Sequence, residues 1–404
     1  MNKKAVAYLV MSISSLSVWE LLAVTKIAGG KTQTILIILS LIPFVYSSFI
    51  LLKDYKFENS YFKFIFSLFI CYQLLIVIRG WSFSYNDLKT YMQTWYVFWP
   101  FIIPLFVFFD KKIATFGLLF KWMYYSGLFF LFISLIFPFL LLRMLTAETF
   151  IGLFIPCGFL LLNASYLSNR KVNLSFLMFF ISIISLTYLA RRSSLSTLLG
   201  FLVSAYFLNL MNKSKSKLFQ YFPLIIIISV FLLFSQFFEN SKEVLFNKIE
   251  SRFSEDTRTG VFELFFNDLN NNMLFGKGMN GVYYCPMNSG EIDGEIYQAV
   301  QYRNLIENGY LQLLLTGGII HIILFLLVLL PAAIKGIFMS SNQFTKACGV
   351  VIFLRLLDMF FYGLPSFTLA YILVWICVGV CYKTSIRRMT NDEIRSEFKK
   401  IGLL

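Results

Sequence analysis

Long apolar segments separated by short polar connections run through most of the chain. A helix needs about 20 apolar residues to cross the hydrocarbon core of a bilayer. This pattern predicts about twelve membrane-spanning helices, at residues 5–24, 33–52, 62–79, 93–109, 116–141, 149–167, 173–190, 194–211, 219–238, 308–330, 346–363 and 366–382. The expected fold class is an all-α polytopic membrane protein with one long extracytoplasmic loop.

These boundaries divide the chain into four parts. Residues 1–238 form a bundle of nine spans, 239–304 form the long loop, 305–382 hold the last three spans, and 383–404 form a solvated or surface-lying helical tail. The apolar stretch after the basic start is longer than in a typical cleaved signal. It is therefore expected to be the first retained span.

Composition supports a membrane protein over a soluble one. The 404 residues are 58% hydrophobic and 14% charged, whereas soluble domains are about 25% charged. The net charge of +14 then concerns topology more than nucleic acid, because Lys and Arg accumulate in cytoplasmic loops. We expect no nucleic-acid partner.

The basic residues also orient the chain. With the amino terminus inside, the cytoplasmic connections contain NKK, KDYKFENSYFK, DKK, NRK, NKSKSK and KTSIRR, whereas the short opposite loops hold few Lys or Arg. Both termini are therefore expected in the cytoplasm. The loop at 239–304 then faces outward, and it holds ten Asp or Glu against six Lys or Arg.

Several arginines lie on the outer side, where this rule disfavours them. Arg191 and Arg192 follow the seventh span in LARRSS, Arg79 ends the third span, and Arg143 ends the fifth. They either snorkel to lipid headgroups, mark a topology shifted by one span, or bind an anionic ligand at the outer face. The sequence leaves these three explanations open.

Charged and reactive side chains within the spans have structural explanations. Arg355 and Asp358 are three residues apart on one helix face, so we expect them to pair. Cys377 and Cys381 are one turn apart without a His or carboxylate beside them, so we predict buried thiols and no metal site. His321, the one histidine, lies in an apolar run and is expected to pack there.

The outward loop contains a short amphipathic helix followed by a turn. Thr259 is expected to cap this helix. Its apolar stripe, which lies on the membrane surface or against the bundle, consists of Val261, Phe262, Phe265, Phe266 and Leu269. The glycines of the following FGKGMNG predict a tight turn, and they are only a weak signal for a phosphate cradle.

The end of the loop leads into the tenth span. YYCPMNSGEIDGEIYQAVQY is expected to be irregular. If the chain is helical from about 300, Arg303 and Glu307 share a face with Tyr310 nearby. Glu307 then either acts chemically or forms an ion pair with Arg303.

These loop residues resemble a known family. TRTGVFELFFNDLNNNMLFGKG followed by ENGYLQLLLTGGII is similar to the loop of the bacterial O-antigen ligase and polymerase superfamily, and LARRSS is similar to that family's Ser–Arg motif. The resemblance covers about residues 190–200 and 252–320. Ligases of the family usually have His where this chain has Glu307, and the acid–Asn pair is more similar to the repeat-unit polymerases.

The resemblance implies a metal-independent, inverting type C glycosyltransferase. It would polymerise undecaprenyl-diphosphate-linked oligosaccharide repeat units into O-antigen, capsule or exopolysaccharide, without a cofactor. Guanidinium groups suit a diphosphate leaving group, and a carboxylate suits a general base. The implied site comprises catalytic Glu307 and Arg258, diphosphate-binding Arg191, Arg192 and Arg303, and substrate-binding Asn308, Tyr310 and Arg79. Asp256 and Glu255 are alternative bases.

Other functions and partners also follow from this resemblance and topology. The alternatives are a ligase that transfers polymer to lipid A core, a lipid-linked oligosaccharide flippase or transporter, and a structural scaffold. The expected location is the bacterial inner membrane. The expected partners are the lipid-linked glycan, membrane lipids, a chain-length regulator and a flippase.

Overall fold

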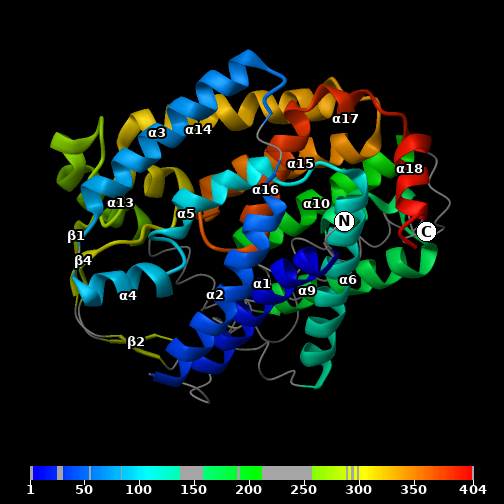
Figure 1. Cartoon of the computed structure of the whole chain (residues 1–404). Coiled ribbons are helices and arrows are strands. Elements are labelled where there is room, and N and C mark those ends of the chain that lie inside the picture. Colours follow the sequence, from blue (N-terminus) through cyan, green and yellow to red (C-terminus); the bar gives the residue numbers. More distant parts are fainter. Residues whose placement is uncertain are drawn as a thin grey trace.

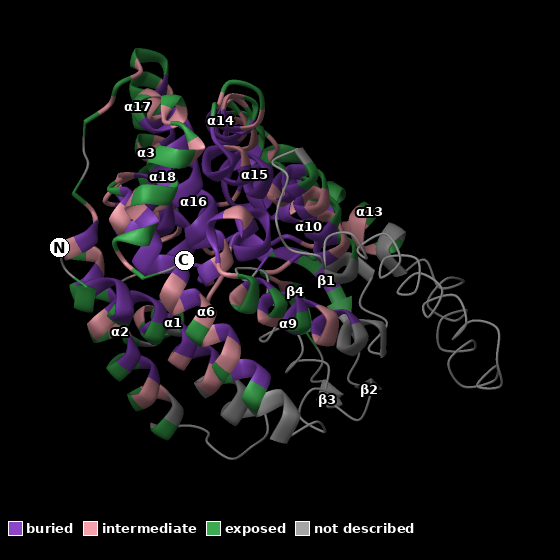
Figure 2. Cartoon of the chain, turned by 90° about the vertical axis from the view of Figure 1, so that its right-hand side faces the viewer, coloured by how far each residue is buried: buried purple, intermediate pink, exposed green. Residues whose placement is uncertain are grey.

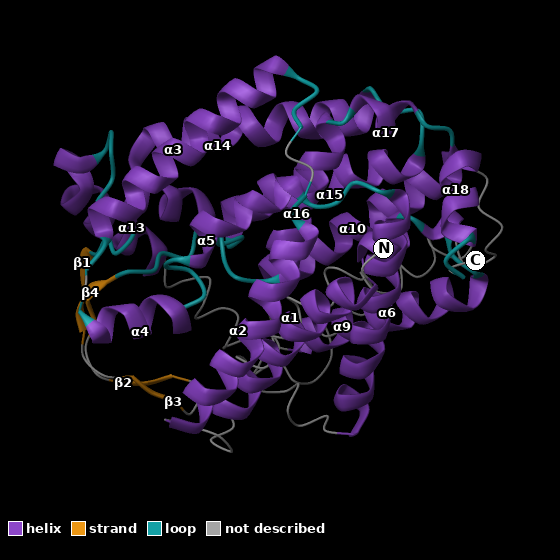
Figure 3. Cartoon of the chain, in the orientation of Figure 1, coloured by secondary structure: helices purple, strands orange, loops and turns teal. Residues whose placement is uncertain are grey.

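A computed structural model of the chain describes residues 3–24, 31–53, 56–82, 84–136, 158–188, 192–211, 257–287, 290–292, 295–297 and 300–402. Most of these residues are helical, as predicted. Figures 1 and 3 show helices throughout, with the short strands gathered along one edge of the molecule.

The part of the chain before the long loop consists mainly of helices. They are α1 (Lys3–Val24), α2 (Lys31–Leu51), α3 (Ser60–Gly80), α4 (Tyr85–Gln93), α5 (Trp99–Ile102), α6 (Ile113–Ile136), α9 (Asn169–Tyr188) and α10 (Arg192–Met211), with 3-10 turns η1 (Ile103–Phe108) and η2 (Ala164–Tyr166). The loop and the part after it contain α13 (Thr257–Leu269), η4 (Asn270–Asn272), β1 (Tyr283–Met287), β2 (Gly290–Ile292), β3 (Glu295–Tyr297), β4 (Val300–Arg303), α14 (Gly309–Phe338), α15 (Gln343–Phe361), α16 (Leu369–Tyr382), α17 (Thr384–Arg388) and α18 (Asn391–Lys399).

Three helices of the described residues are long and apolar enough to cross a membrane. They are Thr34–Leu51 within α2, α3, and α14. Large apolar side chains such as Phe49, Phe64 and Ile78 are exposed on the first two. A soluble protein rarely exposes so continuous an apolar surface, so these helices suggest association with a membrane.

The core lies where α14, α15 and α16 meet. Figure 2 shows buried residues concentrated around α15 and α16. The Trp375 ring is fully buried and stacks on Phe69 of α3 with the ring centroids 5.5 Å apart. A Cβ atom at Gly336 of α14 would stand 2.6 Å from the Gly349 Cα of α15. Glycines at this crossing let the two helix backbones approach closely, as is common between membrane helices.

Several expected spans differ from the structure. The expected span at 93–109 is not confirmed as one long helix, because α4 ends at Gln93 and the helical residues that follow are the contiguous α5 and η1, Trp99–Phe108. Pro100 and Pro104 fall within that stretch, and each removes a backbone donor from a helix. In 149–167, the described residues are helical only to 162 before η2 begins at 164. The expected span at 219–238 lies outside the described residues.

The end of the loop was expected to be irregular, but it forms four short β-strands. β1 pairs with β4 and β2 with β3 in two antiparallel ribbons. In β1, Tyr283 and Cys285 are buried while Tyr284 between them is exposed. This alternation of period two is typical of a strand with one covered face. The described chain is therefore mostly helical, which is compatible with the expected all-α membrane fold, and it adds two short β-ribbons in the loop.

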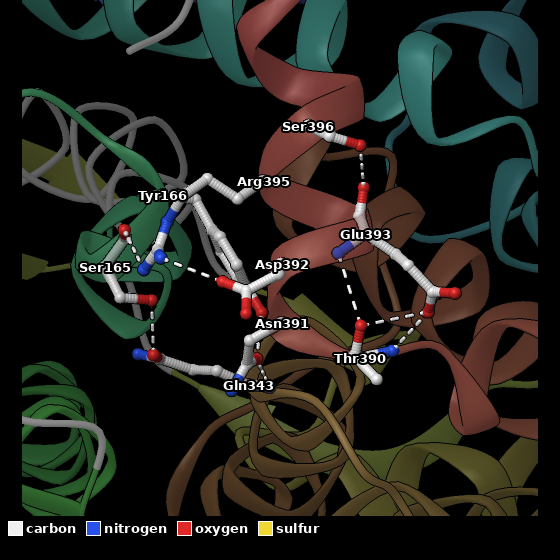
Figure 4. Close-up of polar contacts among 9 residues, drawn as sticks. All are labelled: Ser165, Tyr166, Gln343, Thr390, Asn391, Asp392, Glu393, Arg395 and Ser396. Atoms are coloured by element: carbon white, nitrogen blue, oxygen red, sulfur yellow. Dashed lines mark hydrogen bonds and ion pairs between the residues drawn. The ribbon is translucent and has the colours of Figure 1, made fainter.

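The carboxyl-terminal tail is fixed to the bundle and does not lie free in solvent. Ile394 and Phe398 of α18 are fully buried. The side-chain oxygen of Asn391 accepts hydrogen bonds from the Tyr166 hydroxyl and, at 2.8 Å, from the backbone amide of Gln343 (Figure 4). The tail thus links α15 to the turn at residues 164–166.

Candidate functional site

α14 is broken at a pair of glycines. Gly318 has φ 70° and ψ −170°, which lies outside the helical region. Such a break leaves carbonyl and amide groups without helical partners. Water cannot supply partners within a bilayer, so the protein has to. They come from residues 273–281, called here the inserted segment.

The inserted segment pairs with both sides of the break. The Lys277 amide donates to the Leu315 carbonyl at 2.7 Å, and the Gly278 amide donates to the Thr316 carbonyl at 2.9 Å. Beyond the break, the Ile319 amide donates to the carbonyl of Met273, the first residue of the inserted segment, also at 2.9 Å. The backbone of the segment therefore replaces missing helical hydrogen bonds of α14.

The end of α3 holds the segment from another side. The Met279 amide donates to the Ile76 carbonyl at 3.1 Å. The two terminal nitrogens of Arg79 donate to the carbonyls of Phe275 and Gly276 at 2.8 and 2.7 Å. Arg79 therefore fixes the inserted segment, and its contact with substrate stays a prediction.

The glycine-rich turn is confirmed as a turn. Gly276 and Gly278 have φ values of 66° and 88°, a region that residues with a Cβ atom rarely adopt. The amides at 277, 278 and 279 all donate to carbonyls of α14 or α3. They are thus directed at protein groups and not at a phosphate.

An ion pair ties α13 to the inserted segment. The Lys277 ammonium lies 2.5 Å from the Asp268 carboxylate and also donates to the Val282 carbonyl at 3.0 Å. The same carboxylate accepts the Tyr284 amide at 3.2 Å. Sequence reasoning missed this pair, because nine residues separate the two charges in a segment without regular spacing.

α13 packs on the bundle through part of its predicted stripe. Phe265 and Leu269 are fully buried in a cluster with Tyr283 and Leu315, whereas Phe266 is exposed. The predicted cap at Thr259 is wrong, because α13 already begins at Thr257. Packing against α14 explains the stripe, so no contact with the membrane surface is needed for it.

Asn308 forms the start of α14. Its side-chain oxygen accepts the amides of Tyr310 and Leu311, both at 3.0 Å, and its side-chain nitrogen donates to the Phe360 carbonyl of α15 at 2.8 Å. The Tyr310 hydroxyl donates to the Leu356 carbonyl at 2.8 Å. Asn308 therefore caps α14, and both side chains join α14 to α15, while their contacts with substrate stay predictions.

The predicted pairing of Arg355 with Asp358 is also confirmed, at 3.0 Å. Asp358 additionally accepts a hydrogen bond from the Thr197 hydroxyl of α10 at 2.6 Å. Arg192 begins α10 five residues earlier, about 7.5 Å along the helix axis. The start of α10 therefore lies at the same end of the bundle as the start of α14.

Arg303 and Glu307 do not share a helix face. Arg303 ends β4, and Glu307 lies in a non-helical connection before α14. Both charges nevertheless affect the pKa of the Tyr283 hydroxyl. Burial raises this pKa to about 12, the positive charge of Arg303 lowers it, and the negative charge of Glu307 raises it. Arg303 and the exposed Glu307 thus lie within electrostatic range of the same point.

Several predicted site residues lie outside the described residues. They are Arg143, Arg191, Glu255 and Asp256, together with the side chains of Arg192 and Arg258. The backbone places Arg192 in the first turn of α10 and Arg258 in the first turn of α13. Their predicted contacts with a diphosphate remain predictions.

Two buried or half-buried amides that sequence reasoning missed shape this end of the protein. Gln312 is buried, accepts the Ile306 amide at 3.1 Å, and donates to the Asn304 carbonyl at 3.2 Å. Asn280 donates to the Gly80 carbonyl at 2.8 Å and to the Tyr91 hydroxyl of α4. The sequence did contain one signal for Gln312. It is a polar amide in the otherwise apolar run after residue 309, and such residues usually face the interior of a helix bundle.

His321 packs as predicted. It is 2% exposed, and its ring stacks on those of Phe69 and Phe101 with centroid distances of 5.9 and 6.1 Å. The thiols of Cys377 and Cys381 are buried as predicted, and so are those of Cys285 and Cys348, whereas Cys71 is exposed. His321, Cys348, Cys377 and Cys381 belong to the packing of the bundle.

The described residues define a mostly helical protein with three helices suited to a bilayer and a loop segment inserted into a broken helix. No protein-family model, curated protein or solved structure matches the chain.

Proposed function

We propose that the chain is an integral membrane glycosyltransferase that polymerises undecaprenyl-diphosphate-linked repeat units into O-antigen, capsule or exopolysaccharide. The proposal starts from the resemblance of the loop and of LARRSS to the O-antigen ligase and polymerase superfamily. Its full architecture comprises twelve spans in the bacterial inner membrane, both termini in the cytoplasm and the long loop outside.

One structural relationship carries this proposal. The Thr197 contact to Asp358 and the Asn308 contact to Phe360 bring the starts of α10 and α14 to the same end of α15. Arg192, the first residue of α10, and the acid–Asn pair before α14 are far apart in the sequence, and the two helix starts lie at the same end of α15. β4 with Arg303 leads directly into this region.

In the proposed reaction, a sugar hydroxyl attacks the anomeric carbon of the lipid-linked chain. The new C–O bond forms as the bond to the diphosphate breaks, and Glu307 takes the hydroxyl proton. The diphosphate leaves with the electron pair of the broken bond. Attack from the opposite face inverts the anomeric centre.

The arginines have the complementary task. Arg191, Arg192, Arg258 and Arg303 bind the diphosphate and stabilise the charge that develops on it. Fixed guanidinium groups in a partly dry site can do this without a metal ion, and no Asp–x–Asp sequence occurs in the loop. Asn308, Tyr310 and Arg79 hold the loop and helix ends that surround the sugar.

The broken α14 makes a transporter the second candidate, because many transporters bind substrate at interrupted helices. In such proteins the ends of the half-helices face a cavity. Here, carbonyls of Leu315, Thr316 and Gly317 accept hydrogen bonds from the inserted segment or from the Tyr72 hydroxyl. These groups are therefore occupied by protein, which favours the enzyme.

A glycan gel from a deletion strain, with and without the restored gene, tests the proposal. Collapse of the polymer ladder to a single repeat unit on the acceptor supports a polymerase. Long polymer that accumulates on the lipid carrier without reaching the cell surface indicates the ligase instead. Unpolymerised units retained on the cytoplasmic face indicate the flippase.

A further inference from the structure

An open groove of about 700 Å³ lies between α2 and α4. Ile38 and Ile42 belong to its α2 wall, and Leu88 and Met92 belong to its α4 wall. The volume is within the range of about 300–1,000 Å³ that ligand pockets occupy. Among the described residues of the lining, Lys89 is the one that carries a charge. The groove therefore suits an apolar ligand.

The apolar side chains of the groove are not covered by protein. Ile38 is 53% exposed and Ile42 is 61% exposed. α2 is one of the three described helices that are long and apolar enough to cross a membrane, and its exposed apolar surface continues to Phe49. If α2 crosses the bilayer, the groove opens onto lipid hydrocarbon. Lipid is then the substance that covers its walls.

The two sides of α4 differ. Leu88 and Met92 are four residues apart and share the side of the helix that lines the groove. On a neighbouring side, the Tyr91 hydroxyl accepts hydrogen bonds from the Ser82 amide at 3.1 Å and from the Asn280 side chain of the inserted segment. α4 is thus fixed to the end of α3 and to the loop, while its apolar side stays open.

Trp99 of α5 holds the two walls in place. Its indole N–H donates to the Met92 carbonyl of α4 at 3.0 Å. Its ring packs edge-on against Phe44 of α2, with the ring centroids 5.8 Å apart. Phe44 is buried, so it lies on a different side of α2 from the exposed groove residues. The groove is therefore already formed in the protein without a ligand, which lowers the entropic cost of binding.

The length of the groove indicates which lipid chain it can hold. Thr34 and Tyr46, the first and last described α2 residues of the lining, are twelve residues apart. This separation is about 18 Å along the helix axis. The hydrocarbon core of a bilayer is about 30 Å thick, so the groove is about as deep as one leaflet. One phospholipid acyl chain spans that depth.

We infer that the groove binds one acyl chain of a membrane phospholipid, with the Lys89 ammonium beside the phosphate of that lipid. A chain in the groove contacts two walls, whereas a chain on a single convex helix contacts one. The many small dispersion contacts on the second wall hold this lipid more tightly than its neighbours. The site is independent of the proposed glycosyltransferase activity.

The test uses the purified full chain in a neutral detergent, with dipalmitoyl phosphatidylglycerol as the probe. Native mass spectrometry counts the lipid molecules that stay bound. The groove variant replaces Ile38 and Ile42 by Trp, whose larger side chains occupy the groove. The matched control replaces Leu74 and Ile78 of α3 by Trp, because these residues have the same spacing and are 56% and 69% exposed.

We expect the wild type and the control variant to retain one phosphatidylglycerol and the groove variant to lose it. Lys89→Gln should bind the lipid about five-fold more weakly, which is the contribution of one lysine near an anionic lipid. Lys63→Gln, an exposed change near the start of α3, should bind as the wild type does. If the groove variant does not fold, Met92→Trp obstructs the groove from the α4 side and should cause the same loss.

Two results overturn the inference. One is a wild type that retains no more lipid than the groove variant, and the other is an equal loss in the control variant. Competition with undecaprenyl phosphate then tests which chain the groove holds. Phosphatidylglycerol that stays bound at equal concentration of the competitor supports the inference. Its displacement would assign the groove to the chain of the lipid carrier instead.

Discussion

Gly276 of the inserted segment lies against Gly317 of α14, so closely that a Cβ atom at Gly276 would stand 2.5 Å from the Gly317 nitrogen. Gly318 is equally confined, by the carbonyl of Leu274. The junction between loop and helix therefore depends on residues without side chains. Its consequences can be tested one residue at a time.

Replacement of Gly318 by Ala should destabilise the protein. The backbone conformation at φ 70° and ψ −170° is adopted almost only by glycine and costs a residue with a Cβ atom about 1–3 kcal/mol, and overlap with the Leu274 carbonyl adds to this cost. Thermal unfolding in detergent measures the loss. Gly260→Ala is the control, because its Cβ atom would meet nothing within 4 Å and alanine favours the helix there. Equal midpoints for both variants would contradict the described junction.

Arg79→Lys should weaken the attachment of the inserted segment even though the charge is kept. Lysine lacks the planar fork that reaches two carbonyls at once, and each hydrogen bond from a charged group contributes about 1.5–3 kcal/mol. The unfolding midpoint should fall, while Arg388→Lys at an exposed site should leave it unchanged. An unchanged midpoint together with lost polymer would instead assign Arg79 to substrate binding.

The buried pair of Arg355 and Asp358 should be sensitive to removal of one partner. Asp358→Ala leaves a guanidinium that is 13% exposed without its partner, which typically costs about 3–5 kcal/mol. Asp392→Ala is the matched control, because its pair with Arg395 has the same spacing but is exposed and contributes at most about 1 kcal/mol. Similar losses from both variants would show that burial does not matter here.

Glu307→Gln and Arg258→Ala should abolish polymer while the protein still inserts and folds. Loss of a general base reduces the rate about 10²–10⁴-fold. The glycan ladder and the amount of protein in membranes measure the two effects separately. Glu263→Gln, an exposed change in α13, should leave the ladder intact. Full-length polymer from both site variants would remove these residues from the proposed site.

Acid should loosen the tail. Hydrogen bonds from the Thr390 backbone amide and hydroxyl lower the pKa of Glu393 below its ordinary value of 4.5. A lowered pKa in the folded state means that this contribution is complete above about pH 4.5 and is lost as the pH falls through the folded value. Hydrogen exchange of α18 amides should therefore accelerate in this range. Glu393→Gln should remove this dependence, and Glu397→Gln should keep it.

Hydrophobic periodicity predicted the helices best where the apolar run was long, even though α2 contains Pro43 and α14 contains Pro331. α2, α3 and α14 begin and end within a few residues of the expected spans, except that α14 continues to Phe338. The stretch after Gln93 was apolar enough for a span, but Pro100 and Pro104 interrupt it. Hydropathy averages over such residues and does not register the missing donors.

The loop shows what a local pattern cannot predict. Asp293 and Gly294 between β2 and β3 form a two-residue hairpin signal that was available in the sequence. The sequence carried no comparable signal for the carbonyl groups that accept hydrogen bonds from the inserted segment. Ile76 and Leu315 stand about 200 and 40 residues from the turn that bonds to them, and nothing in either apolar run marks a single carbonyl as an acceptor.

If α14 crosses a bilayer, its break also implies an order for membrane insertion. α3 and the inserted segment are synthesised before α14, so the helix emerges last of the three. As a continuous helix, α14 satisfies its own backbone and can enter the bilayer alone. Only after the segment has docked can the chain open at Gly317 and Gly318 without exposing amides to lipid. We therefore expect the glycine pair to act late in biogenesis, as the point at which an already inserted helix exchanges its own hydrogen bonds for those of the loop.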